Sequence, residues 1–501
     1  MLTPPVRAPD FPDGLDWIHT GGRPISVRDL RGRVALLDFW TYGCINCIHV
    51  LPHLRELERR FGDRLVVIGV HSGKYLAERV PERIREASIR LGATHPIVND
   101  RQFRIWRAYA VRGWPTAVLI DARGRVVATR GGEFTAELLA PVIERLIAES
   151  GEVGGGDGIG APPPTYLPER PALAPGALRY PGKVAGERIT GGVVRLAVSD
   201  TGHHRVLVGA LRDGGRRLAV THVVGCGEPG LVDGPLDAAR LTAPQGVALD
   251  GDTLFVADAG NHAVRRVDLA DGVVRTIAGT GARVMSQEER RAGALASPWS
   301  VAMSGGELYV AMAGTHQLLA MRPDGSRPRV HAGQGGEELR DDLLERALLA
   351  QPMGLAAAGD HLWFADAESS AVRRAGTGRG GRVDTAVGTG LFDFGDRDGV
   401  GDEVRLQHPQ DVAVHPGTGR VLVCDTYNDA LRWLDPVTRR VESWVRGLHE
   451  PGGVAILGDH AYVADTNAHR VVAVHVDTGA VEEVVIEPPT SSPVSGWWYI
   501  S

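Results

Sequence analysis

The chain has 501 residues, more than a single hydrophobic core usually serves, so at least two domains are expected. Its composition, 43% hydrophobic and 23% charged, is that of a globular protein, and 65 glycines against 9 phenylalanines favour turns and short strands. The net charge of −6 divides into +5 for residues 1–150 (22 basic against 17 acidic residues) and −11 for the rest, and neither half has the basic patch that nucleic-acid binding needs.

The sequence shows no sign of export or of a membrane span. Its first residues lack the charged start and the apolar run of a signal peptide, and no segment approaches about 18 uninterrupted apolar residues. We therefore expect a cytoplasmic protein that binds neither membrane nor nucleic acid. Four cysteines are too few for a disulfide framework in a chain of this length, so the close pair Cys44 and Cys47 indicates redox or metal chemistry.

Strands and helices alternate through the first 150 residues, which predicts an α/β domain over 1–150. In chain order we expect a buried strand at 34–40, an amphipathic helix at 48–61, a strand at 65–70, a helix at 80–91, strands at 116–121 and 126–129, and a final helix at 136–149.

Cys44 falls between the first of these strands and the first helix, at or just before the helix N-terminus. Unpaired backbone N–H groups and the helix dipole stabilise a thiolate at such a position, and only a thiolate attacks a disulfide. Cys47 follows one turn later, where it can resolve a mixed disulfide. The spacing therefore predicts a nucleophilic Cys44 and a resolving Cys47.

Residues 151–177 are rich in glycine and proline, including the runs 154–156 and 162–164. Such a composition buries little apolar surface, so we predict a linker here.

Beyond the linker, Pro-x-x-Val-Ala or a close variant recurs ahead of an apolar strand that normally ends in Asp. The copies begin at Pro181, Pro244, Pro298, Pro352, Pro409 and Pro451.

The strand end follows its proline by 14 residues in four of the six copies, whereas the copies themselves lie 42 to 63 residues apart. A rigid unit with variable connections is typical of a blade array. Each unit has room for four short strands, so we predict an all-β six-bladed propeller over 178–487, followed by a tail at 488–501. No strong strand precedes Pro181, and we expect the strand at 481–486 to complete the first blade.

The first domain is similar to thioredoxins beyond its cysteines. Asp38 stands at their buried acidic position, and the run from Gly113 to Thr116, Gly-Trp-Pro-Thr, resembles their cis-proline loop. This resemblance implies that Pro115 is cis and lies beside Cys44, that Asp38 accepts the proton of Cys47, and that Trp114 contributes to substrate binding.

Two departures from thioredoxins concern the redox motif. Gly43 stands where thioredoxins place a tryptophan, and Ile45-Asn46 replaces Gly-Pro between the cysteines. We expect Gly43 to contact the substrate. The intervening dipeptide helps to set the reduction potential, so both directions of electron flow stay open.

The turns that end the recurring strands resemble NHL repeats. They read Asp-Thr-Gly-His-His-Arg-Val from Asp200 and Asp-Ala-Gly-Asn-His-Ala-Val-Arg from Asp258, whereas the third unit departs with Met312. Taken with the thioredoxin-like half, the chain resembles the NHL-repeat-containing protein 2 family, whose members join these two modules.

The favoured hypothesis is a thiol–disulfide oxidoreductase that needs no cofactor. Cys44 is the nucleophile, Cys47 the resolving thiol, Asp38 the proton relay and Pro115 the substrate guide. The partners would be a protein positioned by the propeller and an external thiol reductant or oxidant. The alternative is a non-catalytic interaction scaffold in which the thioredoxin fold has lost its chemistry.

Two metal-dependent interpretations compete with this hypothesis. Zinc held by Cys44, Cys47, His49 and His53 is disfavoured, because this spacing on one helix splays the ligands apart. In the propeller, recurring Asp and Arg residues such as Asp258 and Arg265 are predicted to stabilise turns. The histidines that recur near the same blade position leave a metal-dependent hydrolase or lyase as a third reading; they are His203, His204, His262, His316 and His469.

Overall fold

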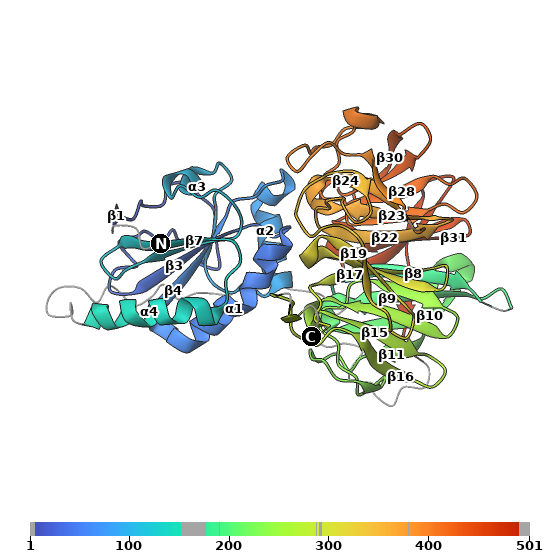
Figure 1. Cartoon of the computed structure of the whole chain (residues 1–501), viewed down its shortest axis with the longest axis horizontal. Helices are drawn as coiled ribbons and strands as arrows, with labels where there is room; N and C mark the ends of the chain where they lie inside the picture. The colour runs from blue at the N-terminus through green and yellow to red at the C-terminus, as the bar shows by residue number, and fades with distance from the viewer. Residues whose placement is uncertain are drawn as a thin grey trace. The chain divides into compact units, whose positions relative to one another are not determined.

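The computed structural model describes residues 6–151, 177–189, 191–286, 288–289, 293–378 and 380–489. The chain divides into two compact units, Met1–Ala172 and Leu173–Ser501, each with its own hydrophobic core (Figure 1). The predicted linker at 151–177 and tail at 488–501 lie almost entirely outside the described residues. The first unit is α/β and the second is all-β, as predicted.

The first unit is built on a seven-stranded sheet with the order β1-β7-β6-β3-β4-β5-β2. Its strands are β1 (Val6–Arg7), β2 (Trp17–Ile18), β3 (Val34–Trp40), β4 (Leu65–His71), β5 (Ile97–Asn99), β6 (Thr116–Ile120) and β7 (Arg125–Gly131). Its α-helices are α1 (Ile45–Phe61), α2 (Pro81–Leu91), α3 (Arg104–Ala108) and α4 (Ala136–Gly151), and single 3₁₀ turns lie at Gly62–Arg64 and Ala77–Arg79.

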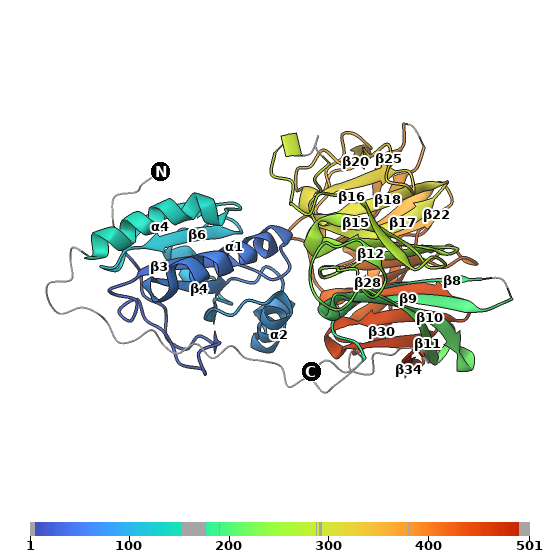
Figure 2. The same ribbon diagram turned by 90° about the horizontal axis from the view of Figure 1, so that it is seen from below.

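The central strand β3 has a different neighbour on each of its faces. Ala35, Leu37 and Phe39 pack into one core together with Ile105 of α3. Side chains alternate along a strand, so Asp38 faces the opposite side. Helices α1 and α4 contact each other and cover that side of the sheet (Figure 2). This arrangement buries Asp38 beneath α1.

Helix α1 begins at Ile45, three residues earlier than predicted, and Cys44 is its N-cap residue. The other predicted elements of this unit are present with shifts of one or two residues at their ends. The short elements β1, β2, β5 and α3 were not predicted, because segments of two to five residues carry too little periodicity.

The second unit consists of six antiparallel blades. From the first blade to the sixth, the inner strands are β8 (Pro181–Arg188), β13 (Val247–Asp250), β17 (Pro298–Ser304), β22 (Pro352–Ala358), β27 (Asp411–Val414) and β31 (Pro451–Leu457). The second strands are β9 (Val194–Asp200), β14 (Thr253–Asp258), β18 (Glu307–Met312), β23 (His361–Asp366), β28 (Val421–Asp425) and β32 (His460–Asp465).

The third strands are β10 (Arg205–Arg212), β15 (Ala263–Asp268), β19 (Gln317–Met321), β24 (Ala371–Gly376), β29 (Ala430–Asp435) and β33 (Arg470–His475). The fourth strands are β11 (Arg217–Val224), β16 (Val273–Ala278), β20 (Arg329–Ala332), β25 (Arg382–Val387), β30 (Arg440–Arg446) and β34 (Val481–Glu483). Short outer strands extend four of the blades: β35 (Val485–Glu487) the first, β12 (Gly234–Pro235) the second, β21 (Asp342–Leu343) the fourth and β26 (Gly399–Val400) the fifth.

The ring closes between the sixth blade and the first, where β31 lies against β8. Our prediction for residues 481–486 was partly wrong. The segment forms two strands: β34 pairs with β33 in the sixth blade, and β35 adds to β11 as a fifth, parallel strand of the first blade. The first blade needs no such completion, because residues 181–224 already supply its four antiparallel strands.

Asp–Arg pairs with a buried carboxylate recur in five of the six blades. They are Asp200–Arg205, Asp258–Arg265, Asp366–Arg373, Asp425–Arg432 and Asp465–Arg470, at 2.7 to 2.9 Å. Each carboxylate also accepts a backbone N–H from the residue two positions before its blade's proline. The third blade has Met312 in place of the aspartate, with Gln317 and Leu319 at the two positions from which the other blades supply the arginine. These contacts confirm the structural interpretation of the recurring Asp and Arg residues.

The recurring histidines join successive blades. A 3₁₀ turn links the second strand of each blade to the third. The side chain of the residue after this turn accepts the backbone N–H of the residue that precedes the next blade's proline. The six contacts, 3.0 to 3.3 Å long, join His204 to Ala243, His262 to Ser297, His316 to Gln351, Ser370 to His408, Asp429 to Glu450 and His469 to Tyr180. The last one links the sixth blade to the first. Blade-to-blade contacts therefore account for His204, His262, His316 and His469, whereas His203 Nδ1 lies 2.9 Å from the Asp200 carboxylate of its own blade.

Replacing Asp366 with alanine is expected to lower the free energy of unfolding of the propeller by about 3 to 5 kcal/mol, because the substitution leaves the buried Arg373 guanidinium without its buried carboxylate. Urea denaturation followed by circular dichroism measures the loss. The matched control combines Asp366→Met with Arg373→Leu, which copies Met312 and Leu319 of the third blade and removes both charges. A single variant no less stable than this double variant would contradict the assignment.

Candidate active site

The two cysteines of the motif lie at the start of α1, where the loop from β3 enters the helix. Cys44 is partly exposed, whereas Cys47 is 0% exposed, and both are free thiols. The backbone N–H groups of Cys47 and Ile48 donate to the Cys44 carbonyl at 3.0 and 3.1 Å, which starts the helix. Burial and the Cys44 thiol raise the pKa of Cys47 well above its usual value. Only Cys44 is therefore open to a substrate, and Cys47 needs a base nearby.

Asp38 supplies a carboxylate on the face of β3 that α1 covers. Its side chain is 0% exposed, and neither carboxylate oxygen has a hydrogen-bond partner. Burial raises the pKa of Asp38 to about 7, with His95 acting in the opposite direction. Asp38 and Cys47 also influence each other electrostatically, since the Asp38 charge raises the pKa of the Cys47 thiol. The structure thus brings the predicted acid and the predicted resolving thiol together.

The predicted cis-proline loop precedes β6. The Trp114–Pro115 peptide bond is cis, as the resemblance to thioredoxins implied. The Trp114 indole N–H donates to the Ser72 carbonyl at 3.0 Å, and its ring packs against Trp106 at 4.6 Å between centroids. The Trp114 side chain is therefore held in one position and stays partly exposed. Its contact with a substrate stays a prediction.

Gly43 is held by a glutamate that the sequence did not single out. The Gly43 N–H donates to Oε1 of Glu78 at 2.9 Å, and the Tyr75 N–H donates to Oε2 of the same carboxylate at 3.0 Å. Glu78 is 0% exposed. It fixes the residue just before Cys44, so the Gly43 amide is already used within the protein. A substrate contact at Gly43 stays a prediction and would involve its other atoms.

His71 supports the same loop from the end of β4. Its Nε2 accepts the Tyr42 N–H at 3.3 Å, and its ring stacks on Tyr42. Burial lowers the pKa of His71 to about 3, so the ring stays neutral and keeps this acceptor. Its place directly after an apolar strand beside β3 was the one sequence signal for it. Glu78 gave no signal, because it lies between the predicted elements and belongs to no recognised motif.

The zinc reading of the motif gains no support. His49 Nδ1 is engaged with the Glu133 carboxylate at 2.8 Å. Within the part of the chain that the structure describes, no group of three or more His, Cys, Asp or Glu side chains is arranged to hold a metal ion.

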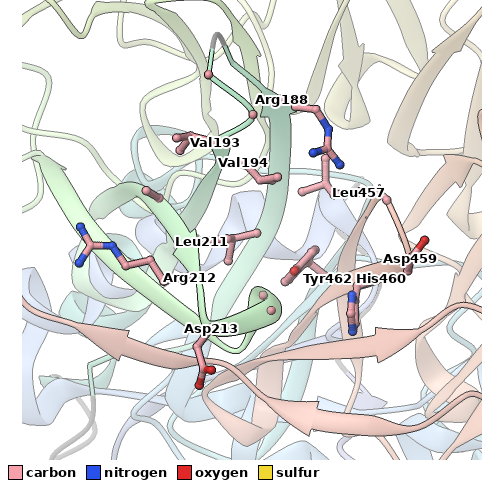
Figure 3. A pocket seen from close by; sticks show the side chains of 16 residues that line it. Arg188, Val193, Val194, Leu211, Arg212, Asp213, Leu457, Asp459, His460 and Tyr462 are labelled. Atoms are coloured by element: carbon pink, nitrogen blue, oxygen red, sulfur yellow. The ribbon is translucent and has the colours of Figure 1, made fainter.

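The propeller has a hollow of its own between the first and sixth blades, with a volume of about 660 Å³. Leu211, Leu457 and Tyr462 give it apolar walls, and Arg188 and Asp459 bring charges of both signs (Figure 3). It contains no cysteine, so it is separate from the thiol chemistry.

The fold and the site define a class of two-domain proteins. In this class a thioredoxin-like domain with a Cys-x-x-Cys site is followed in the same chain by a six-bladed propeller. A family model described as thioredoxin-like matches residues 32–126. Over an alignment of 546 residues the chain is 35% identical to NHL repeat-containing protein 2 of Bos taurus, covering 98% of this chain and 73% of that protein. The chain belongs to the NHL repeat-containing protein 2 family.

Two further relatives match different shares of the chain. Protein SUPPRESSOR OF QUENCHING 1, chloroplastic, of Arabidopsis thaliana is 35% identical and covers 97% of this chain and 49% of its own length. Thiol-disulfide oxidoreductase ResA of Geobacillus thermodenitrificans is 32% identical over 128 residues, which are 25% of this chain and 70% of that protein. No helix among the described residues has the length and apolar character of a membrane span.

Proposed function

We propose that this protein is a thiol–disulfide oxidoreductase that acts on a protein substrate held by the propeller. One observation carries the proposal: Cys44 is accessible at the N-terminus of α1, while Cys47 and the unpartnered carboxylate of Asp38 are buried behind it. This is the arrangement that a nucleophile, a resolving thiol and a proton acceptor require. The similarity of the first domain to a thiol-disulfide oxidoreductase supports the same chemistry.

The exchange proceeds in two displacements. The Cys44 thiolate attacks one sulfur of a substrate disulfide, so a Cys44–substrate bond forms as the substrate S–S bond breaks and its other sulfur leaves as a thiolate. Cys47 then gives its proton to the Asp38 carboxylate, and the Cys47 thiolate attacks the Cys44 sulfur. The second substrate thiolate leaves. The substrate has gained two electrons, and the protein holds a Cys44–Cys47 disulfide.

An external dithiol reductant completes the cycle by reducing this disulfide. With an external disulfide oxidant instead, the same displacements run in reverse and the protein oxidises its substrate. Neither direction calls for a cofactor. A cytoplasmic setting, where thiol reductants are abundant, suits the reducing direction.

The propeller's part in the proposal is to select the substrate. A closed ring of six blades is rigid and offers broad faces, and the hollow at its seam combines apolar walls with charges of both signs. Gly43 occupies the position of a large side chain in thioredoxins, so the redox domain itself offers less surface for recognition. Both features favour recognition by the propeller.

A covalent trap tests this division of labour. Cys47→Ser removes the resolving thiol, so a substrate attacked by Cys44 stays bound and is recovered from lysate under non-reducing conditions. We expect the full chain to retain a defined set of proteins and residues 1–150 with the same substitution to lose most of them. The control carries Cys44→Ser as well. Equal capture by both lengths would refute selection by the propeller, and capture that survives in the control would favour the non-catalytic scaffold.

A further inference from the structure

Buried polar atoms without hydrogen-bond partners gather beneath α1. They belong to Asp38 and Trp40 of β3 and to His95, which lies between α2 and β5: both Asp38 carboxylate oxygens, Trp40 Nε1 and both ring nitrogens of His95. The three residues are 0 to 2% exposed. Native proteins leave few such atoms unpaired, and a group of them beside a redox centre calls for a functional explanation.

Gly69 creates the space that these side chains share. In the parallel pairing of β3 with β4, Gly69 is the partner of Asp38. A Cβ atom on Gly69 would lie 2.8 Å from Trp40 Nε1 and 3.2 Å from His95 Nε2, too close for a side chain. Asp38 and Trp40 are two residues apart on one strand and so share this face. The missing side chain lets the His95 imidazole reach the face that carries Asp38.

On the other side of its ring, His95 faces Glu58 of α1, whose side chain reaches the surface. His95 Nδ1 lies 3.8 Å from Glu58 Oε1, and the two side chains are 1% and 26% exposed. A rotation of the partly exposed Glu58 side chain closes that separation. Two further ionisable groups interact electrostatically with these residues: Arg55 with Glu58, and Cys47 with Asp38. An acid, an imidazole and a second acid therefore connect the interior to solvent.

Resting on the proposed function, we propose that His95 and Glu58 carry the proton between Asp38 and solvent when Cys47 resolves the mixed disulfide. The proton that Asp38 took from Cys47 passes to His95 Nε2, while His95 Nδ1 gives its own proton to Glu58, which releases it to water. One proton leaves for each disulfide formed, and the steps reverse when the disulfide is reduced. Both residues act through Asp38 and touch no reacting sulfur.

The buried position of Asp38 makes such a route necessary. Its carboxyl group is fully buried, yet it must take up a proton and give it up again in every turnover of the proposed cycle. Burial raises the pKa of Asp38 to about 7, so the group can take up and release a proton near neutral pH once a path exists.

The test separates the two displacements in a single-turnover reaction with glutathione disulfide. We expect His95→Gln and Glu58→Gln to leave the Cys44-dependent first step unchanged and to slow the resolving step by about tenfold or more. That loss is smaller than the roughly hundredfold to ten-thousandfold contribution of a direct general acid–base group. Glu56→Gln, also on α1 and partly exposed, is the matched control and should behave as the unsubstituted protein.

Two further measurements distinguish a proton relay from a purely structural role. The dependence of the resolving step on pH near 7 should change in both variants, and added imidazole should restore part of the lost rate in Glu58→Gln. Unchanged rates, or an equal loss with an unaltered pH profile and no rescue by imidazole, would overturn the relay. If the unsubstituted protein shows no Cys44-dependent first step, the proposed function itself fails and the relay falls with it.

Discussion

Replacing Asp38 with asparagine is expected to slow the resolving step by about a hundredfold to ten-thousandfold, the range in which a positioned general base contributes. Asparagine has nearly the same shape and cannot take the proton of Cys47. Burial raises the pKa of the Cys47 thiol, so this proton does not leave by itself near neutral pH. The first displacement, which needs only Cys44, should keep its rate. Rapid mixing with glutathione disulfide resolves the two phases.

The same substitution is expected to stabilise the protein. The pKa of Asp38 is about 7 in the folded chain, against about 4 in an unfolded one. Between these values the folded state holds a proton that the unfolded state has released, so the free energy of unfolding falls as pH rises. Above pH 7 the buried carboxylate is charged, so the full free-energy cost of burying that charge lowers the stability of the folded protein. Asparagine carries no such charge.

The stability advantage of Asp38→Asn should therefore grow from about pH 4 to about pH 7 and then stay constant. Urea denaturation at several pH values measures it. Opposite changes in rate and stability identify a group kept for function at the expense of stability. A variant that is both slower and less stable at every pH would instead indicate that Asp38 is structural.

The sequence predicted those parts of the molecule whose signals are local and repeated. Apolar periodicity located β3, α1, β4, α2 and α4, because a buried face imposes its period on each element. Six copies of one proline-led unit predicted six blades, since every blade solves the same packing problem. The sequence did not predict that the apolar run at 481–486 divides into two strands near Val484, because such a run does not reveal which neighbouring strand each half will pair with.

The candidate site was predicted only as far as its motif extends. Cys44, Cys47 and Asp38 lie within ten residues of one another, and Pro115 belongs to a recognisable loop. Glu78, His71 and His95 come from separate segments and are ordinary residue types in ordinary surroundings. The parallel pairings of β3 with β4 and of β4 with β5 bring His95 towards Asp38. Such convergence is a property of the fold rather than of any stretch of sequence.

Replacing Cys44 with serine is expected to remove disulfide exchange completely, because the hydroxyl neither ionises near neutral pH nor forms a bond to sulfur that exchange could continue. The substitution changes one partly exposed atom at the N-cap of α1, so folding should be unaffected. Cys226→Ser, which alters a partly exposed cysteine of the propeller, is the matched control and should keep full activity.

The decisive measurement is the rate at which the full chain, supplied with a dithiol reductant, reduces the disulfides of a protein substrate such as insulin at neutral pH. The proposed function predicts a rate well above that of the reductant alone for the unsubstituted protein and for Cys226→Ser, and a rate equal to the reductant alone for Cys44→Ser. If the unsubstituted protein is no faster than Cys44→Ser with either a dithiol reductant or a disulfide oxidant, the oxidoreductase assignment is contradicted and a non-catalytic scaffold takes its place.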